Sequence, residues 1–171
     1  MNSHSHLGNT MAKPQSISTC IWMNNQGEEA ANFYVSLFPN SRIVHVSRYG
    51  PGQPMPEGTA MLTRFEIDGV SFAILNGGPM FPLSEALSLV VTCDSQAELD
   101  RLWNALIADG GAESHCGWCK DRFGLSWQLI PAQIADWMSS SDKDALGRMW
   151  GQLMQMRKLD IATLAAAFHG S

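Results

Sequence analysis

The chain has 171 residues, of which 45% are hydrophobic and 16% are charged, and its formal net charge at pH 7 is -5. This composition is typical of a folded globular protein and excludes a disordered chain. The 11 Lys and Arg residues form no basic run, so the clustered phosphate contacts of a nucleic-acid partner are not expected.

The segment 1–15 is predicted to be a flexible tail outside the fold. It is polar, contains His4 and His6, and lacks the apolar region of a secretory signal. The longest apolar runs later in the chain, such as 86–91, are too short to span a bilayer. We therefore expect a cytoplasmic protein with no membrane partner.

A first module, 16–79, is predicted to run strand, helix, strand, strand, strand. Its helix, 28–38, has an apolar stripe at i, i+3, i+4, i+7 and i+8, formed by Ala30, Phe33, Tyr34, Leu37 and Phe38. Acidic residues at 28 and 29 suit the N-terminal end of the helix dipole. The strands are expected at 17–23, 42–49, 59–67 and 70–75, where short apolar runs are bounded by turn residues.

A second module, 80–131, is predicted to repeat this order. Its helix, 95–108, begins with Ser95 and Glu98 in the spacing of a capping box and ends before Gly110. Strands are expected at 86–92, 112–119 and 125–130, with one strand of the set short or hard to recognise.

The two modules read as an internal duplication. An offset of 69 positions places Phe33 on Leu102 and the strand 17–23 on 86–92. The last strands match with a smaller offset of 55, from Gly69 to Gly124, and the Pro/Gly-rich stretch 50–58 accounts for the difference. The alternative is two unrelated units with similar patterns. The duplication predicts an α+β fold made of two βαβββ modules.

The last part of the chain, 132–171, is predicted to be helical. Helices are expected at 131–138, 142–157 and 160–168, with Asp142 and Asp160 as N-caps. The middle helix has an apolar, Met-rich face that either packs on the core or forms a partner surface. Both alternatives remain open from the sequence.

Several motifs resemble those of one protein family. They are CIWM (20–23), GEEA (27–30), NFY with LFP (32–39), LNGGP (75–79), CGW (116–118), DRFGLSWQ (121–128) and MQMRKLDI (154–161). With them the chain resembles the vicinal-oxygen-chelate superfamily, and within it the PhnB-like branch, also called 3-demethylubiquinone-9 3-methyltransferase. This resemblance implies a half-barrel built from the paired modules and a homodimer. Cys119 and the residues 23–25 depart from the usual pattern of the branch.

The resemblance also implies where a ligand would bind. Metal-using relatives take His or Glu ligands from the first and last strands of each module. The matching positions here are Thr19, Ser88, Ala73 and Gln128. These side chains make no competent site for a transition metal, because they offer neither imidazole nor carboxylate groups. We therefore expect no metal, no cofactor, and a pocket for a small, uncharged or weakly polar organic molecule.

Further candidates are weighed against simpler roles. Asn76, at a strand exit before Gly77 and Gly78, either grips a ligand or only forms a turn. Trp118 is expected to line the pocket, whereas alternation directs Trp127 and Leu129 into the core.

Two histidines are weaker candidates. His115, in the second module, is the candidate for proton transfer, and His45 lies near the equivalent position of the first. Histidines on strands are more often surface residues.

The pair Cys116 and Cys119 has the C-x-x-C spacing of thiol redox and zinc sites. Such a redox pair needs its first cysteine at a helix N-terminus, whereas this pair is expected at a strand end with its side chains on opposite faces. Reduced, packed thiols are the expectation that we prefer.

Three functions follow as hypotheses. The first is a metal-free PhnB-like protein that binds a small molecule as a homodimer. The second is a quinone-type methyltransferase, which needs S-adenosylmethionine, although no Gly-rich strand-to-helix turn of the usual kind is present. The third is a non-catalytic protein that sequesters a drug or metabolite.

Overall fold

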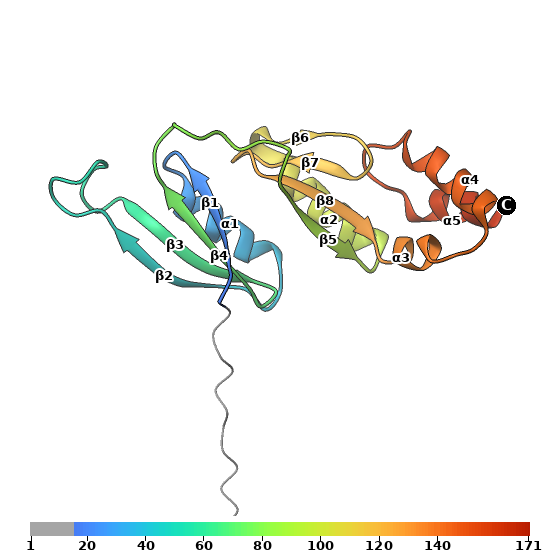
Figure 1. Cartoon of the computed structure of the whole chain (residues 1–171), viewed down its shortest axis with the longest axis horizontal. Coiled ribbons are helices and arrows are strands. Elements are labelled where there is room, and N and C mark those ends of the chain that lie inside the picture. Colours follow the sequence, from blue (N-terminus) through green and yellow to red (C-terminus); the bar gives the residue numbers. More distant parts are fainter. Residues whose placement is uncertain (1–15) are drawn as a thin grey trace, which may run out of the picture.

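The computed structural model describes residues 16–171, so the predicted tail lies outside the described residues. The first module contains β1 (Thr19–Met23), α1 (Gly27–Leu37), β2 (Arg42–Arg48), β3 (Ala60–Ile67) and β4 (Val70–Asn76). Its sheet has the order β1-β4-β3-β2, in which β1 pairs with β4 in parallel and the other pairs are antiparallel. The Pro/Gly-rich stretch forms the loop between β2 and β3, which extends from one end of the molecule (Figure 1).

The second module contains β5 (Ser88–Cys93), α2 (Gln96–Ile107), a 3-10 turn η1 (Ala108–Gly110), β6 (Ala112–Glu113), β7 (Trp118–Lys120) and β8 (Ser126–Pro131). Its sheet order, β5-β8-β7-β6, repeats that of the first sheet. The predicted α+β fold with duplicated βαβββ modules is therefore confirmed, and both sheets are open. The stretch expected as one strand, 112–119, is split by a turn at Cys116 and Gly117, whose φ angles are 58° and 83°.

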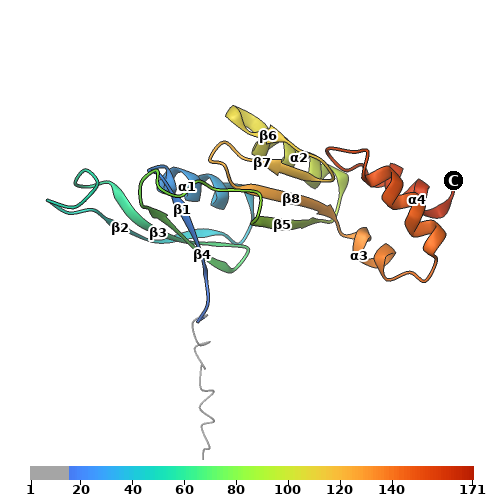
Figure 2. The same cartoon turned by 45° about the horizontal axis from the view of Figure 1, so that its top comes forward.

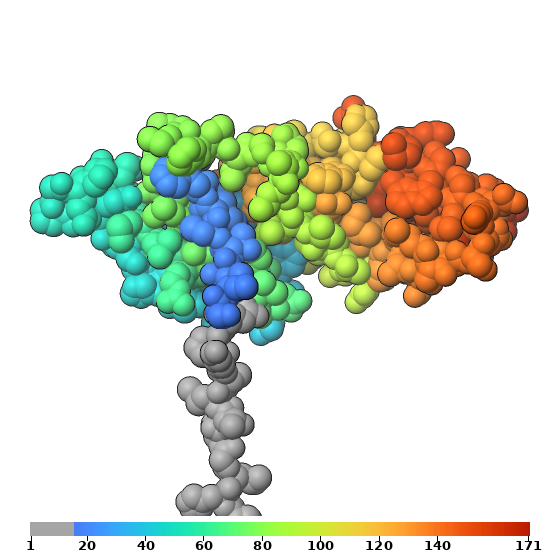
Figure 3. Space-filling model, in the orientation of Figure 1, coloured from blue at the N-terminus to red at the C-terminus, as the bar shows by residue number. Residues whose placement is uncertain are grey.

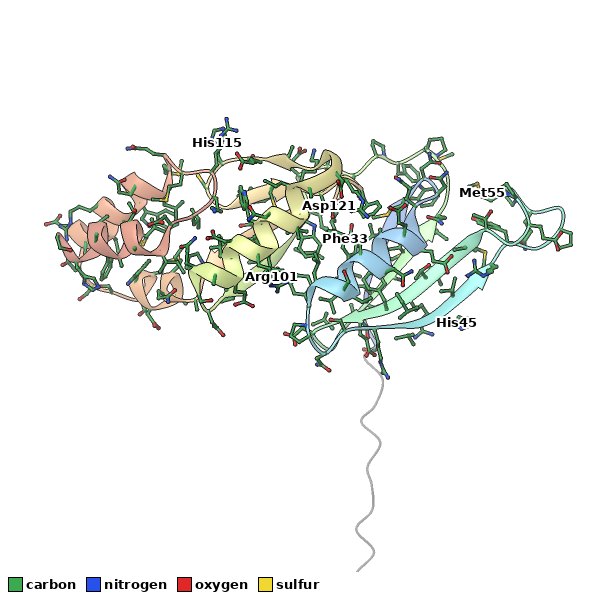
Figure 4. The ribbon with its side chains drawn as sticks, turned by 180° about the vertical axis from the view of Figure 1, so that it is seen from behind. Phe33, His45, Met55, Arg101, His115 and Asp121 are labelled. Atoms are coloured by element: carbon green, nitrogen blue, oxygen red, sulfur yellow. The ribbon has the colours of Figure 1, made fainter. Side chains whose placement is uncertain are left out.

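Both central helices lie on the same side of the molecule. Helices α1 and α2 are behind the sheets in Figure 1 and in front of them in Figure 4, and the tilted view of Figure 2 shows the same layering. The opposite side of each sheet is uncovered by helices, and we call it the open face. In Figure 3 the connecting segment between β4 and β5, in green, runs along the upper part of this side.

Alternation along the strands decides which side chains reach each face. In β1, Ile21 and Met23 are buried against the helix layer, whereas Cys20, which precedes Ile21, is exposed. In β8, Trp127 and Leu129 are 1% and 0% exposed, which confirms the prediction that both belong to the core. The core therefore lies between the sheets and helices α1 and α2.

Asp121 joins the two modules. Its buried carboxylate accepts hydrogen bonds of 2.8 Å from the Tyr34 hydroxyl on α1 and 2.8 Å from Trp127 Nε1 on β8. Two further bonds come from the backbone amides of Phe123 and Leu125, at 2.9 and 3.1 Å. Burial raises the pKa of the Asp121 carboxyl, and these hydrogen bonds oppose that rise.

Aromatic and cationic side chains extend this junction. The Arg122 guanidinium lies 4.6 Å from the ring centres of both Phe33 and Phe123. Figure 4 shows Phe33 on α1 close to Asp121, at the meeting of the two modules. The junction is therefore formed by α1 and the turn that precedes β8.

Three helices follow the second sheet: α3 (Gln133–Met138), α4 (Lys143–Leu153) and α5 (Ile161–His169). The predicted caps are confirmed, since Asp142 accepts from the amides of residues 144 and 145, and Asp160 accepts from that of Thr163. Met149 and Leu164 are fully buried, which favours the core-packing alternative for this region. No helix in residues 16–171 is long and apolar enough to cross a membrane.

Candidate binding site on the open face of the second sheet

Three of the predicted ligand residues lie together on the open face of the second sheet. Gln128 of β8 is paired in register with Val90 of β5 on one side and Trp118 of β7 on the other. Its side-chain amide donates a hydrogen bond of 2.9 Å to the hydroxyl of Ser88. A hydroxyl, an amide and an indole ring are thus adjacent on a face that no helix covers.

The neighbouring row of the same face is also polar. Ser126 of β8 is paired with Ser88 on β5 and with Lys120 on β7. Ser126 is only 2% exposed, and its hydroxyl has no hydrogen-bond partner among the described residues. Lys120 forms an ion pair with Glu85 of the connecting segment. Ser126, Lys120 and Glu85 line a cavity of about 180 Å³.

Thr19 does not share this arrangement. It has the strand parity of the buried Ile21 and Met23, so it lies on the helix-covered side of the first sheet. The prediction applied to the first strand the offset of 69 positions that relates the two helices. That offset fails for the strands, because three residues, 24–26, separate β1 from α1, whereas two residues, 94 and 95, separate β5 from α2. A slip of one residue moves a side chain to the other face of a sheet, which explains the error.

Asn76 is used inside the protein. Its side-chain oxygen accepts a 2.8 Å hydrogen bond from the amide of Gly27, and its nitrogen donates one of 2.9 Å to the carbonyl of Ala60. The following amides, those of Gly77 and Gly78, donate to the carbonyls of residues 23 and 24. Asn76 is 2% exposed and fastens the end of β4 to the start of α1, so it is not available to a ligand.

The open face of the first sheet has different chemistry. The position equivalent to Gln128 is Ala73, which is paired with Cys20 on β1 and Arg64 on β3. Arg64 is in turn paired with His45 on β2. A thiol, a guanidinium and an imidazole thus replace the neutral groups of the second sheet, so the duplication did not produce two equal sites.

The remaining candidates lie away from the polar rows. His115 is exposed in the turn between β6 and β7 and points away from the sheets, and His45 lies on β2, the edge strand of the first sheet (Figure 4). Cys116 contacts the sulfur of Met154 at 3.6 Å, whereas Cys119 is buried on the helix-covered side. Burial raises the pKa of the Cys119 thiol to about 12, which opposes the thiolate form that redox and zinc chemistry need.

The donor set can be tested for a metal ion. Gln128, Ser88 and Ala73 offer an amide, a hydroxyl and a methyl group, whereas transition metals prefer imidazole, thiolate and carboxylate groups. Nowhere in the described part of the chain do three His, Cys, Asp or Glu side chains gather in a way that could hold a metal ion. These positions therefore do not fit the metal of the metal-using relatives.

Two further cavities lie near the junction of the modules. One, of about 450 Å³, is mainly apolar and is lined by Phe38, Phe72, Leu89, Val90 and Trp127, among others. The other, of about 350 Å³, lies between the connecting segment and the turn after β1. Neither is lined by the predicted site residues, and the apolar cavity is the alternative site for a ligand.

Sequence reasoning missed Lys120, Ser126 and Glu85. Alternation from Gln128 would have given Ser126, since residues two positions apart share a face. The turn that precedes β8 would then have paired Lys120 with Ser126. Glu85 carried no sequence signal, because a connecting segment without regular structure reveals nothing about what it covers.

Comparisons with known proteins agree with this fold. The chain matches the family model described as 3-demethylubiquinone-9 3-methyltransferase over residues 15–130. A PhnB protein from Bacillus cereus is 36% identical, with 69% of this chain and 100% of that chain covered and a TM-score of 0.65. This chain belongs to the 3-demethylubiquinone-9 3-methyltransferase family.

More distant structures share the fold of this chain. Protein PA1353 from Pseudomonas aeruginosa is 22% identical, with 67% of this chain and 96% of that chain covered and a TM-score of 0.56. The fosfomycin resistance protein FosX from Mesorhizobium loti is 15% identical, with 75% and 99% covered and a TM-score of 0.52. No curated protein matches the chain.

The family name implies S-adenosylmethionine, and the chain can be tested for a fit. The turn after β1 leads into Gly27, the first residue of α1, but a Cβ there would lie 2.6 Å from Ile74 Cγ2 and 2.7 Å from Asn76 Oδ1. The space at this glycine is thus filled by the protein's own side chains, and its amide already donates to Asn76. The turn does not fit a nucleotide cofactor, which needs close approach to free backbone amides.

Proposed function

We propose that this member of the family binds a small organic molecule on the open face of the second sheet, without a metal ion. The observation that carries the proposal is the group formed by Ser88, Trp118 and Gln128, which lie side by side and unobstructed by any helix. An aromatic surface beside a few polar groups is typical of small-molecule sites. The unpartnered hydroxyl of Ser126 adds a hydrogen-bonding group to the same face.

The proposal is for binding, and it assigns no reaction. His115, the candidate for proton transfer, is exposed and points away from the sheets. Methyl transfer is not adopted, because the turn at Gly27 does not fit the cofactor. Sequestration of a drug or metabolite needs only the binding surface and stays a second candidate. A cytoplasmic location also stays a prediction, and the described cysteines, all of them free, are consistent with it.

A thermal-shift screen with a library of small compounds tests the binding proposal. The hits are then measured against Gln128→Ala and Trp118→Ala, which remove the amide and the ring. We expect affinity to fall by about tenfold for each variant, from the loss of a hydrogen bond or a stacking surface. Ser71→Ala, at the equivalent of Ser126 on the first sheet, is the matched control and should leave affinity unchanged.

Two outcomes would contradict the proposal. One is that no compound raises the melting temperature. The other is that hits lose affinity only through Phe72→Ala, which would move the site to the apolar cavity between the modules. A compound that binds to the His115→Ala variant with unchanged affinity supports a binding role. If the protein converts a compound, and the His115→Ala variant loses this activity while it keeps its affinity, the protein is an enzyme.

We further propose that the chain is a homodimer in which a second copy covers part of the open face. Large apolar side chains are exposed along the connecting segment and β5: Met80 at 72%, Phe81 at 57%, Leu87 at 52% and Val90 at 60%. Apolar residues gathered in one segment are a common feature of protein interfaces. Light scattering should give twice the chain mass, and Leu87→Asp should give a monomer, whereas the control Val44→Asp should not.

A further inference from the structure

We propose that the cavity lined by Lys120 and Ser126 binds the carboxylate group of a small organic acid. In the absence of the acid, the carboxylate of Glu85 forms the ion pair with Lys120. This inference rests on the proposed function, because it specifies the chemical class of a ligand for the same face. The sequence prediction of an uncharged ligand considered only the neutral side chains, and Lys120 was not among them. A cation on this face changes the class of molecule that the site would select.

The first argument is the unpartnered hydroxyl of Ser126. The residue is 2% exposed, and its oxygen has no hydrogen-bond partner within residues 16–171. Buried hydroxyl groups are nearly always hydrogen-bonded, so an exception next to a cavity indicates a group that is free for a ligand. Ser126 lines the cavity of about 180 Å³ together with Trp118 and Lys120. A carboxylate oxygen in this cavity would accept a hydrogen bond from that hydroxyl.

The second argument is the ion pair that closes the cavity. Glu85 reaches Lys120 from the connecting segment, where its side chain is 67% exposed. Glu85 therefore supplies the kind of group, a carboxylate, that we propose for the ligand. Exposed ion pairs contribute little to stability, so a ligand carboxylate that also reaches Ser126 would compete effectively for Lys120. The connecting segment would then release Glu85 to water at little cost.

The other charges near the cavity are already engaged. Glu113 also lines it, but one of its oxygens accepts a hydrogen bond of 3.2 Å from Trp103 Nε1 and the other lies 3.6 Å from Arg157. Asp121 directs its carboxylate to the junction with α1, on the covered side. Lys120 lines this cavity and the cavity of about 350 Å³ beside the connecting segment, and its ion-pair partner is Glu85.

The dimensions of the cavity limit the acid. The cavity of about 180 Å³ has room for several water molecules. A carboxylate with a short carbon chain fits this volume. A larger apolar part would extend over Trp118 and the row of Gln128 and Val90. The site would thus select an acidic head group, with the rest of the molecule on the open face.

A titration with propionate and propionamide tests the inference, since the two have similar shapes and differ in charge. Binding is followed by backbone amide chemical shifts in the full-length protein. Propionate should shift the amides of β7 and of the start of β8, and propionamide should do so at least about tenfold more weakly, as expected for a charge-assisted hydrogen bond.

Variants separate the three side chains. Lys120→Met should weaken propionate binding by about tenfold or more, and Lys120→Arg should restore it. Glu85→Gln should strengthen binding by about two- to fivefold, because the competing carboxylate is lost. Ser126→Ala should weaken it by about fivefold. Glu57→Gln, an exposed acid in the loop between β2 and β3, controls for net charge and should change nothing.

The outcomes distinguish this inference from the proposed function. Propionate binding that is unchanged in both Lys120→Met and Glu85→Gln would overturn the carboxylate site. The carboxylate site would also be overturned by a neutral library compound that binds through Trp118 and Gln128 and keeps its affinity for the Lys120→Met variant. In that case the proposed function would stand. If no compound and no acid shifts the amides of the second sheet, both fail. Amide spectra of each variant establish that it is folded.

Discussion

On the helix-covered face of the second sheet, the carboxylate of Asp121 accepts four hydrogen bonds, whereas on its open face the hydroxyl of Ser126 accepts none from any described residue. Both side chains are 2% exposed. They lie only a few residues apart, on either side of one turn and within one sheet. Burial alone therefore does not explain the difference between them.

The difference indicates that polar groups have different roles on the two faces. Asp121, on the covered face, is fully hydrogen-bonded, because an unmet polar group in the core would lower the stability of the fold. Ser126, on the open face, is left with spare hydrogen-bonding capacity. The covered face holds the two modules together, whereas the open face is the side on which we propose that a ligand binds.

The largest effect is expected for Asp121→Ala. This change leaves the Tyr34 hydroxyl and the Trp127 indole buried without an acceptor, and should lower the free energy of unfolding by about 3–5 kcal/mol. Chemical denaturation measures it. Asp68→Ala, in the corresponding but exposed turn of the first module, is the control and should cost less than about 1 kcal/mol. Equal losses in the two variants would mean that Asp121 is not a special residue of the junction.

A smaller effect is expected for Tyr34→Phe. The ring stays in the core, but the carboxylate of Asp121 loses one of its donors, which should cost about 1–2 kcal/mol. Because Tyr34 and Asp121 share this bond, the double variant should lose less than the sum of the two single losses. Additive losses, measured by the same denaturation, would contradict a direct interaction across the modules.

The reactivity of the cysteine thiols allows the two faces to be compared without a mutation. Cys20 lies exposed on the open side, whereas burial raises the pKa of Cys93 to about 11 and that of Cys119 to about 12. Since the thiolate is the reactive form, iodoacetamide at pH 8 should label Cys20 at least about 100-fold faster than Cys119. Mass spectrometry of digested samples gives the rates. Rapid labelling of Cys119 in the folded protein would show that the covered face opens.

The smallest effect on stability is expected for Ser126→Ala. The hydroxyl has no partner to lose, so its removal should leave the free energy of unfolding within about 0.5 kcal/mol or raise it slightly. A loss above about 1 kcal/mol in denaturation would mean that the hydroxyl is bound after all, and the contrast with Asp121 would disappear. The same variant should weaken propionate binding, so stability and binding respond differently to one change.

Much of the fold could be predicted from residue patterns. The stripes of α1 and α2, the caps Asp142 and Asp160, and the core positions of Trp127 and Leu129 all follow from periodicity and local hydrogen bonding. Ser88, Trp118 and Gln128 were predicted for one pocket and lie on one face. Their role in binding stays a prediction.

The errors have two physical causes. For Thr19, the gap between β1 and α1 contains one extra residue. Because side chains alternate along a strand, this shift of one residue moves the Thr19 side chain to the other face of the sheet. Asn76 was placed at a pocket mouth because its strand exit is rich in glycine, but its partners, Gly27 and Ala60, are distant in sequence. No local pattern reveals contacts of that kind.

The sequence by itself determined the two modules, their helices and the absence of metal-binding side chains at the family positions, since these depend on residue types and short-range spacing. Only the tertiary structure decided which side of each sheet is covered, that Asp121 joins the modules, and that Glu85 reaches Lys120. These features depend on packing between segments far apart in the chain.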